Sequence, residues 1–461
     1  MQKAIAKYGL AAHLALLAVA PLFLFPYCGD ETVAVVLLWL SLPAAAWTVL
    51  QPSVRRGEML HDARNRVARE LVRDPLFWVM LAIVVATGVR AINTGVAMSY
   101  NAEIAKWSIS EAMMPLFPAS CGNGGFLPFS ASVACLVVVA ACRHALGRAA
   151  RQGYLLVSST MAGVAAAVAL YQANVGNSAA LGAIACQMKD MSFVGTAFAL
   201  HFLGGIAALS ATIENKWNRA MPLSVLSVGG TAAGMLAFAP TYNACVFLAA
   251  GAVVAAYAFF HCMFAVKAAA EFKFVVFMAV CIVCGWMLET ATVPGGAVNA
   301  RVAALFSGDI FPMGYSAARK ALSAVALKSW ISQPWTGSGI GSFALDIRFN
   351  ATPGDWAAIP RGLSASPFGW LTLLAERGII GAAMFALPVL FMAFTFVRRL
   401  VTWAFTRTAP QPACWAGPIA FAAVAVSAFF DCSFMRADVL VAAGGFFALS
   451  ASSFPKNGRG G

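Results

Sequence analysis

The sequence predicts an all-α, polytopic membrane protein with about twelve transmembrane helices, and three observations support this class. Hydrophobic residues make up 61% of the 461 residues, only 11% are charged, and the mean hydropathy is +0.79. The apolar runs are long, and about 20 consecutive apolar residues cross the hydrocarbon core of a bilayer. Lys and Arg gather in alternate loops between these runs. We therefore expect one integral membrane domain over residues 1–461, in contact with the lipid bilayer, rather than a string of soluble domains.

The apolar segments follow one another with short breaks. The first one comes after Lys3 and Lys7, and it is too long for the apolar region of a signal peptide, so we expect a first span with a cytoplasmic N-terminus. Asp74-Pro75 opens the third span, and Gly and Pro breaks place 97–125 outside, partly as an interfacial helix. The expected spans are about 8–27, 32–50, 75–96, 126–142, 154–173, 193–212, 222–239, 243–261, 273–291, 378–397, 415–431 and 437–454.

The charge distribution orients the chain. In this topology most of the 31 Lys and Arg residues lie on the inner side, and most of the 18 acidic residues lie outside, as the positive-inside rule requires. Both termini are then cytoplasmic. The longest non-membrane stretch, the loop 292–365 before the last three helices, faces the periplasm of a cell inner membrane. The net charge of +13 reflects this orientation, and we expect no nucleic-acid partner.

Histidines and cysteines give no metal or redox signature. None of the five histidines lies in the outer loop, so no cluster has the spacing of metal ligands. His201 lies within the sixth span, either packed at a helix interface or facing a substrate. Most of the eleven cysteines lie in apolar runs, and the pairing of those near outer loops cannot be deduced. These four are Cys28, Cys121, Cys186 and Cys432.

The outer loop carries the charges that suggest chemistry. The sequence lacks a phosphate-binding GxxxxGK[ST] loop, so we expect no ATP and no other cofactor. Arginine binds phosphate oxygens in a bidentate manner and lysine binds them as a point charge. A pyrophosphate-bearing lipid would need such cations at the membrane surface, although the same cations could instead neutralise nearby aspartates. The residues concerned are Arg319, Lys320, Lys328, Arg348 and Arg361.

Glu376 and Arg377 directly precede the glycine that opens the next apolar span. Charged residues at membrane depth are costly and usually face a cavity or a partner. The pair is therefore either part of a substrate site or a local ion pair at the interface.

Four tryptophans near this segment have two possible roles, as a membrane-interface belt or as surfaces that stack against sugar rings. They are Trp330, Trp335, Trp356 and Trp370.

Two glycine-punctuated blocks carry a resemblance to a known family. The first runs from Gln333-Pro334 through Gly337-Ser-Gly-Ile-Gly-Ser-Phe343, and the second is Glu376-Arg-Gly-Ile-Ile-Gly381. With Arg319 before them, they resemble the O-antigen ligase and polymerase superfamily, membrane glycosyltransferases of the GT-C type. The twelve expected spans and the large outer loop agree with that resemblance.

The resemblance implies transfer of a glycan from an undecaprenyl-pyrophosphate carrier to an acceptor at the periplasmic face. The acceptor would be lipid A-core, a growing polysaccharide or a protein hydroxyl. Arg319 would hold the donor pyrophosphate, with Lys320, Arg348, Arg361 and Arg377 as further candidates. Neither a metal nor a cofactor is implied, because the polyprenyl-pyrophosphate is itself the activated leaving group.

Two positions depart from the family pattern. Pro367 stands where the family has a histidine, and Asn243 stands near its second basic position. Either the chain is a transferase that uses another base, or it is a polymerase-like member, or it binds polyprenyl-linked glycan without catalysis. The candidate bases are Glu376, Asp346, Asp355 and His201. A lipid or polysaccharide transporter is the alternative from another class, and it would need a pathway open to both sides.

Overall fold

The computed structural model describes most of the chain, and every structural statement below concerns these parts. They are residues 2–24, 28–54, 57–94, 98–101, 106–109, 120–175, 191–214, 220–238, 315–359, 369–406, 413–429 and 435–452, with the single positions 250, 279, 283 and 287. Within them the chain is mostly helical, as the sequence predicts. The predicted spans 243–261 and 273–291 lie almost entirely outside the described residues.

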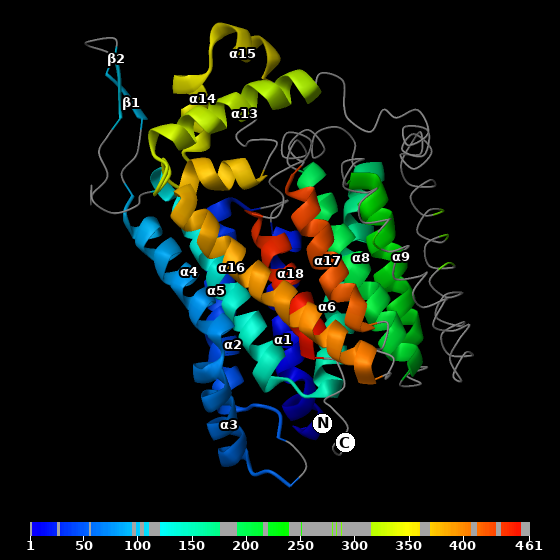
Figure 1. Ribbon diagram of the computed structural model, residues 1–461. Coiled ribbons are helices and arrows are strands. Elements are labelled where there is room, and N and C mark those ends of the chain that lie inside the picture. The colour runs from blue at the N-terminus through cyan, green and yellow to red at the C-terminus, as the bar shows by residue number, and fades with distance from the viewer. Residues whose placement is uncertain are drawn as a thin grey trace.

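Most of the helices run side by side as one bundle (Figure 1). In chain order the bundle helices are α1 (Gln2–Leu24), α2 (Asp30–Leu50), α4 (Pro75–Ile92), α5 (Phe126–Ala140), α6 (Arg148–Val175), α8 (Met191–Glu214), α9 (Met221–Phe238), α16 (Gly369–Thr406), α17 (Ala413–Ser427) and α18 (Ala437–Ser452). Six described helices are long and apolar enough to cross a membrane, in α2, α4, α5 with its extension, α6, α9 and α16. Shorter apolar helices lie in α1, α8, α17 and α18. This agrees with the predicted class of helical membrane protein.

Local sequence explains where α4 begins. Asp74 caps the helix by accepting a hydrogen bond from the Leu76 N–H at 3.1 Å, and Pro75 occupies the first helical position, where its missing N–H costs nothing. Ahead of it, between the predicted second and third spans, lies the helix α3 (Leu60–Arg73). Its buried positions Ala63 and Val67 are four residues apart, so they share one face, and most of its other residues are charged or polar.

A short β-hairpin lies within 97–125, the stretch predicted to be partly interfacial helix, of which residues 110–119 lie outside the described part. Strands β1 (Met98–Asn101) and β2 (Lys106–Ile109) pair antiparallel, with Met98 opposite Ile109. A 3₁₀ turn, η1 (Gly122–Gly125), then leads into α5. Alternation of Tyr, Trp and Ile with polar residues suits a strand better than a helix, and the prediction missed this signal.

Small residues let the bundle helices pack closely. A Cβ at Gly230 of α9 would lie 2.8 Å from the Gly163 carbonyl oxygen of α6, so these two backbones nearly touch. Such approaches replace hydrophobic burial as the source of packing energy when the surroundings are apolar. The core between α6, α8 and α18 is filled by large side chains such as Tyr154, Phe198 and Phe446.

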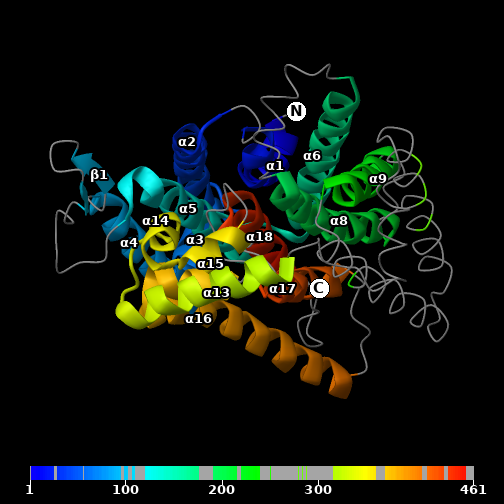
Figure 2. The same ribbon diagram turned by 90° about the horizontal axis from the view of Figure 1, so that it is seen from above.

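Three further helices lie across one end of the bundle, which we call the platform end. They are α13 (Tyr315–Ser332), α14 (Phe343–Asn350) and α15 (Pro353–Ala358). α16 starts beneath them, turns at Gly378 and then descends along the outside of the bundle (Figures 1 and 2). Helix α1 begins and α18 ends at the opposite end (Figure 1). The platform has its own small apolar cluster, which includes Leu322, Val325, Phe343 and Ile347.

Candidate functional site

The two glycine blocks meet beneath the platform, and we call residues 334–343 and 375–381 together the glycine junction. Gly378 has φ 64° and ψ −172°, a backbone conformation that ends the first helical segment of α16 and redirects the chain. Gly337, Gly339 and Gly341 also have positive φ values. Residues with a Cβ rarely adopt this region, so the glycines of both blocks are explained by backbone geometry.

Close contact between the two blocks adds a second reason for glycine. A Cβ at Gly337 would overlap the backbone of Glu376 and Arg377, and one at Gly378 would overlap Trp335. Main-chain hydrogen bonds join the blocks across this contact. The Ser338 N–H donates to the Ala375 carbonyl at 2.9 Å, Gly339 to Glu376 at 3.0 Å and Ile379 to Pro334 at 2.8 Å.

Arg90, near the end of α4, holds the junction from the bundle side. Its guanidinium donates to the carbonyl oxygens of Thr336 at 3.0 Å, Glu376 at 3.1 Å and Arg377 at 3.2 Å. The residue is buried, and its three bonds join the first glycine block, through Thr336, to the end of the first segment of α16, through Glu376 and Arg377. Sequence reasoning missed Arg90. The available signal was an arginine inside an otherwise apolar span.

Glu376 is turned into the junction. Its carboxylate accepts hydrogen bonds from the backbone N–H groups of Gly341 and Phe343, and the residue is 7% exposed. No contact within 4 Å joins it to Arg377 among the described residues, although the two opposite charges attract each other. Glu376 stabilises the turn of the first glycine block.

Asp346 on α14 also faces inward. Its Oδ2 accepts hydrogen bonds from Ser329 at 2.7 Å and Ser338 at 2.8 Å, with Ser342 at 3.5 Å. Burial raises the pKa of Asp346 above its ordinary value, although the three serine hydroxyls act in the opposite direction. The carboxylate thereby ties α13, α14 and the first glycine block together.

The Arg377 side chain takes a different direction from that of Glu376. It runs past Gly381, where a Cβ would overlap it, and its Cζ lies 4.7 Å from the centre of the Phe385 ring. The residue is 5% exposed, and its Nε has no hydrogen-bond partner among the described residues. A guanidinium over an aromatic face is a favourable cation–π contact, and no carboxylate lies within 4 Å of this charge among the described residues, although the Glu376 carboxylate attracts it from further away. Gly381 therefore makes room for a buried cation.

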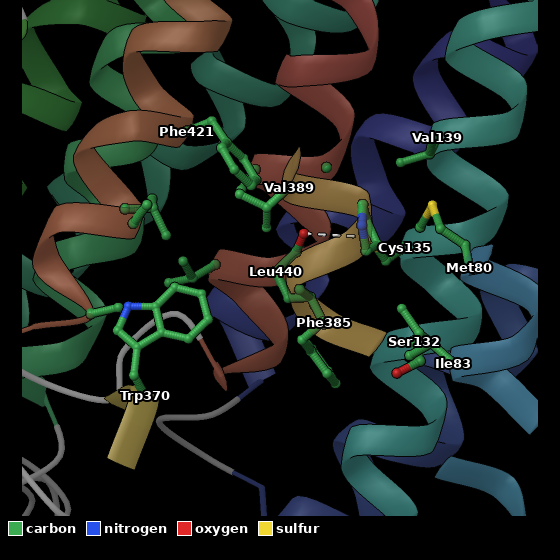
Figure 3. A pocket seen from close by; sticks show the side chains of 17 residues that line it. Met80, Ile83, Ser132, Cys135, Val139, Trp370, Phe385, Val389, Phe421 and Leu440 are labelled. Atoms are coloured by element: carbon green, nitrogen blue, oxygen red, sulfur yellow. Dashed lines mark hydrogen bonds between the residues drawn. The ribbon is translucent and has the colours of Figure 1, made fainter. Parts of the chain in front are cut away.

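An apolar cavity of about 100 Å³ lies between α16 and the bundle, and Phe385 connects it to this cation, which does not itself line the cavity. Figure 3 shows Trp370 and Phe421 on one side of it and Met80, Ile83 and Cys135 on the other. Phe385 lines the cavity and also carries Arg377 on its ring. The full lining is Met80, Ile83, Ser132, Cys135, Val139, Trp370, Phe385, Pro388, Val389, Phe421, Val424, Ala425, Ala428, Val439, Leu440, Ala443 and Gly444.

The other predicted phosphate-binding residues are spread over the platform. Arg319 Nη2 donates to the Phe429 carbonyl at 2.9 Å, which ties the start of α13 to the end of α17. Lys328 lies nine residues further along, roughly 14 Å at 1.5 Å per residue, and bonds the Asn350 carbonyl. Lys320 and Arg348 are exposed on α13 and α14. Arg361 lies outside the described residues, as does Pro367.

Two of the four candidate bases lie away from the junction. Asp355 caps α15, where its carboxylate accepts from the Thr352 N–H at 2.9 Å and hydroxyl at 2.7 Å. His201 lies in the core on α8, fully buried, with its ring edge-on to Phe446 at 5.2 Å. Neither of its ring nitrogens has a hydrogen-bond partner among the described residues. In the described part, each of the four carboxylate or imidazole candidates is held in a structural position.

Metal ligands and disulfides add nothing to the site. The described residues hold no group of three or more His, Cys, Asp or Glu placed to bind a metal ion. Cys28 and Cys121 are free thiols, whereas Cys186 and Cys432 lie outside the described residues.

In comparisons with known proteins, no protein-family model and no curated protein matches the chain.

Proposed function

We propose that this chain binds an undecaprenyl-pyrophosphate-linked glycan at the outer face of the inner membrane and transfers the glycan to an acceptor, in the manner of O-antigen ligases and polymerases. One observation carries the proposal. The buried Arg377 guanidinium lies over Phe385, with no carboxylate within 4 Å among the described residues, and Phe385 lines an apolar cavity. A cation that shares an aromatic ring with an apolar cavity suits an amphipathic ligand with an anionic head.

The chemistry of such a carrier fits each part of this site. A polyprenyl chain is an apolar ligand, and the cavity walls are almost entirely apolar side chains. A pyrophosphate carries the negative charge that an arginine fork binds, and a buried guanidinium binds it more strongly than an exposed one because little water competes. In glycan transfer the bond from the anomeric carbon to the phosphate oxygen breaks, so the electron pair and the developing charge remain on the pyrophosphate, where a cation stabilises them.

The proposed topology is that of the GT-C type, with twelve spans and both termini in the cytoplasm. The basic loops predicted on one side support this orientation through the positive-inside rule. The platform helices α13 to α15 would then lie in the periplasm, where ATP is absent. The activated carrier would supply the free energy of transfer.

Non-catalytic binding of the same carrier is the second candidate, and a specific observation favours it. Glu376, Asp346, Asp355 and His201 each have a structural position that does not face the cavity. Transfer would then require a proton acceptor from a segment outside the described residues, such as Asp431, which the sequence places just after α17.

An assay with purified protein in lipid nanodiscs separates these candidates. It measures binding of a polyprenyl-pyrophosphate glycan and release of the free carrier with lipid, glycan and protein acceptors. We expect Arg377→Gln to lose binding and Arg319→Ala to weaken it, while the exposed Lys328→Gln serves as the matched control and keeps it. Carrier release by the wild type supports transfer. Binding without release for every acceptor supports the binder, and absence of binding contradicts both.

A further inference from the structure

Helix α13 presents apolar side chains on two opposite sides. One side packs into the platform cluster through Leu322, Val325 and Ala326, which are buried. The other side carries Leu327, exposed by 44%, and Ile331, exposed by 65%. An exposed apolar stripe on a helix that has already buried its core face requires another partner.

The exposed stripe continues past the end of α13. Trp335, three residues after the helix, is 66% exposed, and it lies against α16 because the Ile380 N–H bonds its carbonyl at 3.3 Å. Ile379 and Ile380 are themselves 40% and 51% exposed. We call Leu327, Ile331, Trp335, Ile379 and Ile380 the exposed stripe.

Below the kink the same surface runs down α16. Leu387, Leu390 and Phe394 are at least 50% exposed, and they lie on a helix whose length and composition suit a membrane span. The exposed stripe is thus continuous with a surface that faces lipid if α16 crosses the bilayer. A separate protein partner would leave that continuity unexplained.

A lysine and a tryptophan indicate that the exposed stripe lies at the depth of the lipid headgroups. Lys320 is exposed and precedes Leu327 and Ile331 by seven and eleven residues, so it lies on the same face of the helix, whereas Lys328 donates to the Asn350 carbonyl. Lysines at a membrane surface bury their methylene stems and hold the ammonium among lipid phosphates, and tryptophan favours the same level. α13 also lies across the end of the bundle rather than along it (Figures 1 and 2).

We propose that α13 is an interfacial helix that binds bilayer phospholipids, with the exposed stripe among the acyl chains and Lys320 at the headgroup phosphates. The occupant is ordinary phospholipid of the leaflet nearest the platform. This contact anchors the glycine junction at the membrane surface, because Pro334 and Trp335 hydrogen-bond the backbone just after Gly378. Lys320 then serves the bilayer rather than the glycan carrier. The inference requires a membrane-spanning chain, but not the proposed glycan chemistry.

Photocrosslinking tests this in vesicles of phosphatidylcholine and phosphatidylglycerol that contain no polyprenyl carrier. The photoreactive residue p-benzoylphenylalanine replaces Ile331, with Leu390 as the positive control and Trp356 of α15, which is 47% exposed, as the matched negative control. We expect phospholipid adducts at positions 331 and 390, detected by intact mass, and no adduct at position 356.

Two results would overturn the inference. One is an absence of lipid adduct at position 331 while 390 reacts, and the other is an adduct to a second protein copy, which would make the stripe a protein interface. Should the variant at 331 fail to fold, the same substitution at Leu327 replaces it. Because the vesicles lack the carrier, failure here leaves the proposed glycan binding untouched, and a loss of carrier binding leaves this result untouched.

Discussion

The two ends of the bundle satisfy their buried charges in different ways. At the end opposite the platform, Asp74, Arg143 and His144 pair with one another, since Asp74 Oδ2 accepts from Arg143 Nε and lies beside His144 Nε2, both at 2.8 Å. His144 Nδ1 also lies 3.4 Å from Glu70. We call these four residues the ion cluster. In the glycine junction, by contrast, the charged groups bind backbone groups and hydroxyls.

The difference indicates which end has capacity for an external ligand. In the ion cluster both carboxylates have an arginine nearby, Asp74 with Arg143 at 2.8 Å and Glu70 with Arg66 at 3.7 Å, and the cluster joins α3 and α4 to the turn after α5. The junction places Arg90 on carbonyls and leaves Arg377 on an aromatic ring. A buried cation with no carboxylate in direct contact is costly in a protein alone, and an anionic ligand in contact with Arg377 would reduce that cost.

The largest expected effect concerns the backbone of the junction. In Gly378→Ala the new Cβ would overlap Trp335 at a φ of 64°, so we expect a loss of about 3 kcal/mol or more in the free energy of unfolding. Thermal unfolding in detergent measures it. The matched control is Gly354→Ala, where the nearest atom to the new Cβ is 3.9 Å away. Equal melting temperatures for the two variants would show that the junction is not held by close backbone contact.

A second pair of variants compares the two ends directly. Arg90→Met removes three hydrogen bonds at about 1 kcal/mol each, so we expect about 3 kcal/mol of destabilisation. Arg143→Met leaves Asp74 with His144, and we expect about 1 to 2 kcal/mol. Chemical unfolding followed by tryptophan fluorescence compares them. A larger loss for Arg143→Met would reverse the contrast between the two ends.

His201 belongs to neither network, and its replacement tests that separation. Its ring nitrogens have no hydrogen-bond partner among the described residues, so His201→Leu removes a buried polar group and should stabilise the fold by about 1 kcal/mol. Carrier binding and release should stay at the wild-type level. An inactive variant with an unchanged melting temperature would instead assign His201 a catalytic role.

The smallest expected effects are opposite pH dependences at the two ends. Burial raises the pKa of Asp346, so its contribution to stability is complete below the ordinary value of 3.8 and declines as the pH rises through its higher folded pKa. Burial also opposes ionisation of Asp74, but the His144 hydrogen bond and the charges of Arg143 and His144 outweigh it and hold the pKa of Asp74 below 3.8. Its contribution is present above 3.8 and is lost as the pH falls through the folded pKa.

Melting temperatures measured from about pH 3 to about pH 7 separate these signs. The melting temperature of Asp346→Asn, relative to that of the wild type, should rise as the pH increases above 3.8. The amount by which the melting temperature of Asp74→Asn lies below that of the wild type should decrease as the pH falls below 3.8. Parallel curves for both variants would mean that the two carboxylates experience similar environments.

Much of the fold was predictable, because lipid imposes a simple rule on the chain. Apolar runs of about 20 residues must form helices in a bilayer, where backbone groups find no water. The β-hairpin and α3 were missed because they lie outside the apolar runs, where that rule does not apply. The importance of the two glycine blocks was also visible, since Gly-rich spacing predicts unusual backbone geometry.

The sequence by itself determined the helical membrane class and the residues that demand glycine. Only the tertiary structure decided what those glycines bring together. Arg90 and Glu376 are 286 residues apart, and no local pattern predicts that one guanidinium will hold three carbonyls of the junction. The directions of Glu376 and Arg377 were undecided for the same reason. Adjacent side chains diverge at a kink, and the kink is set by contact with Trp335 in a distant segment.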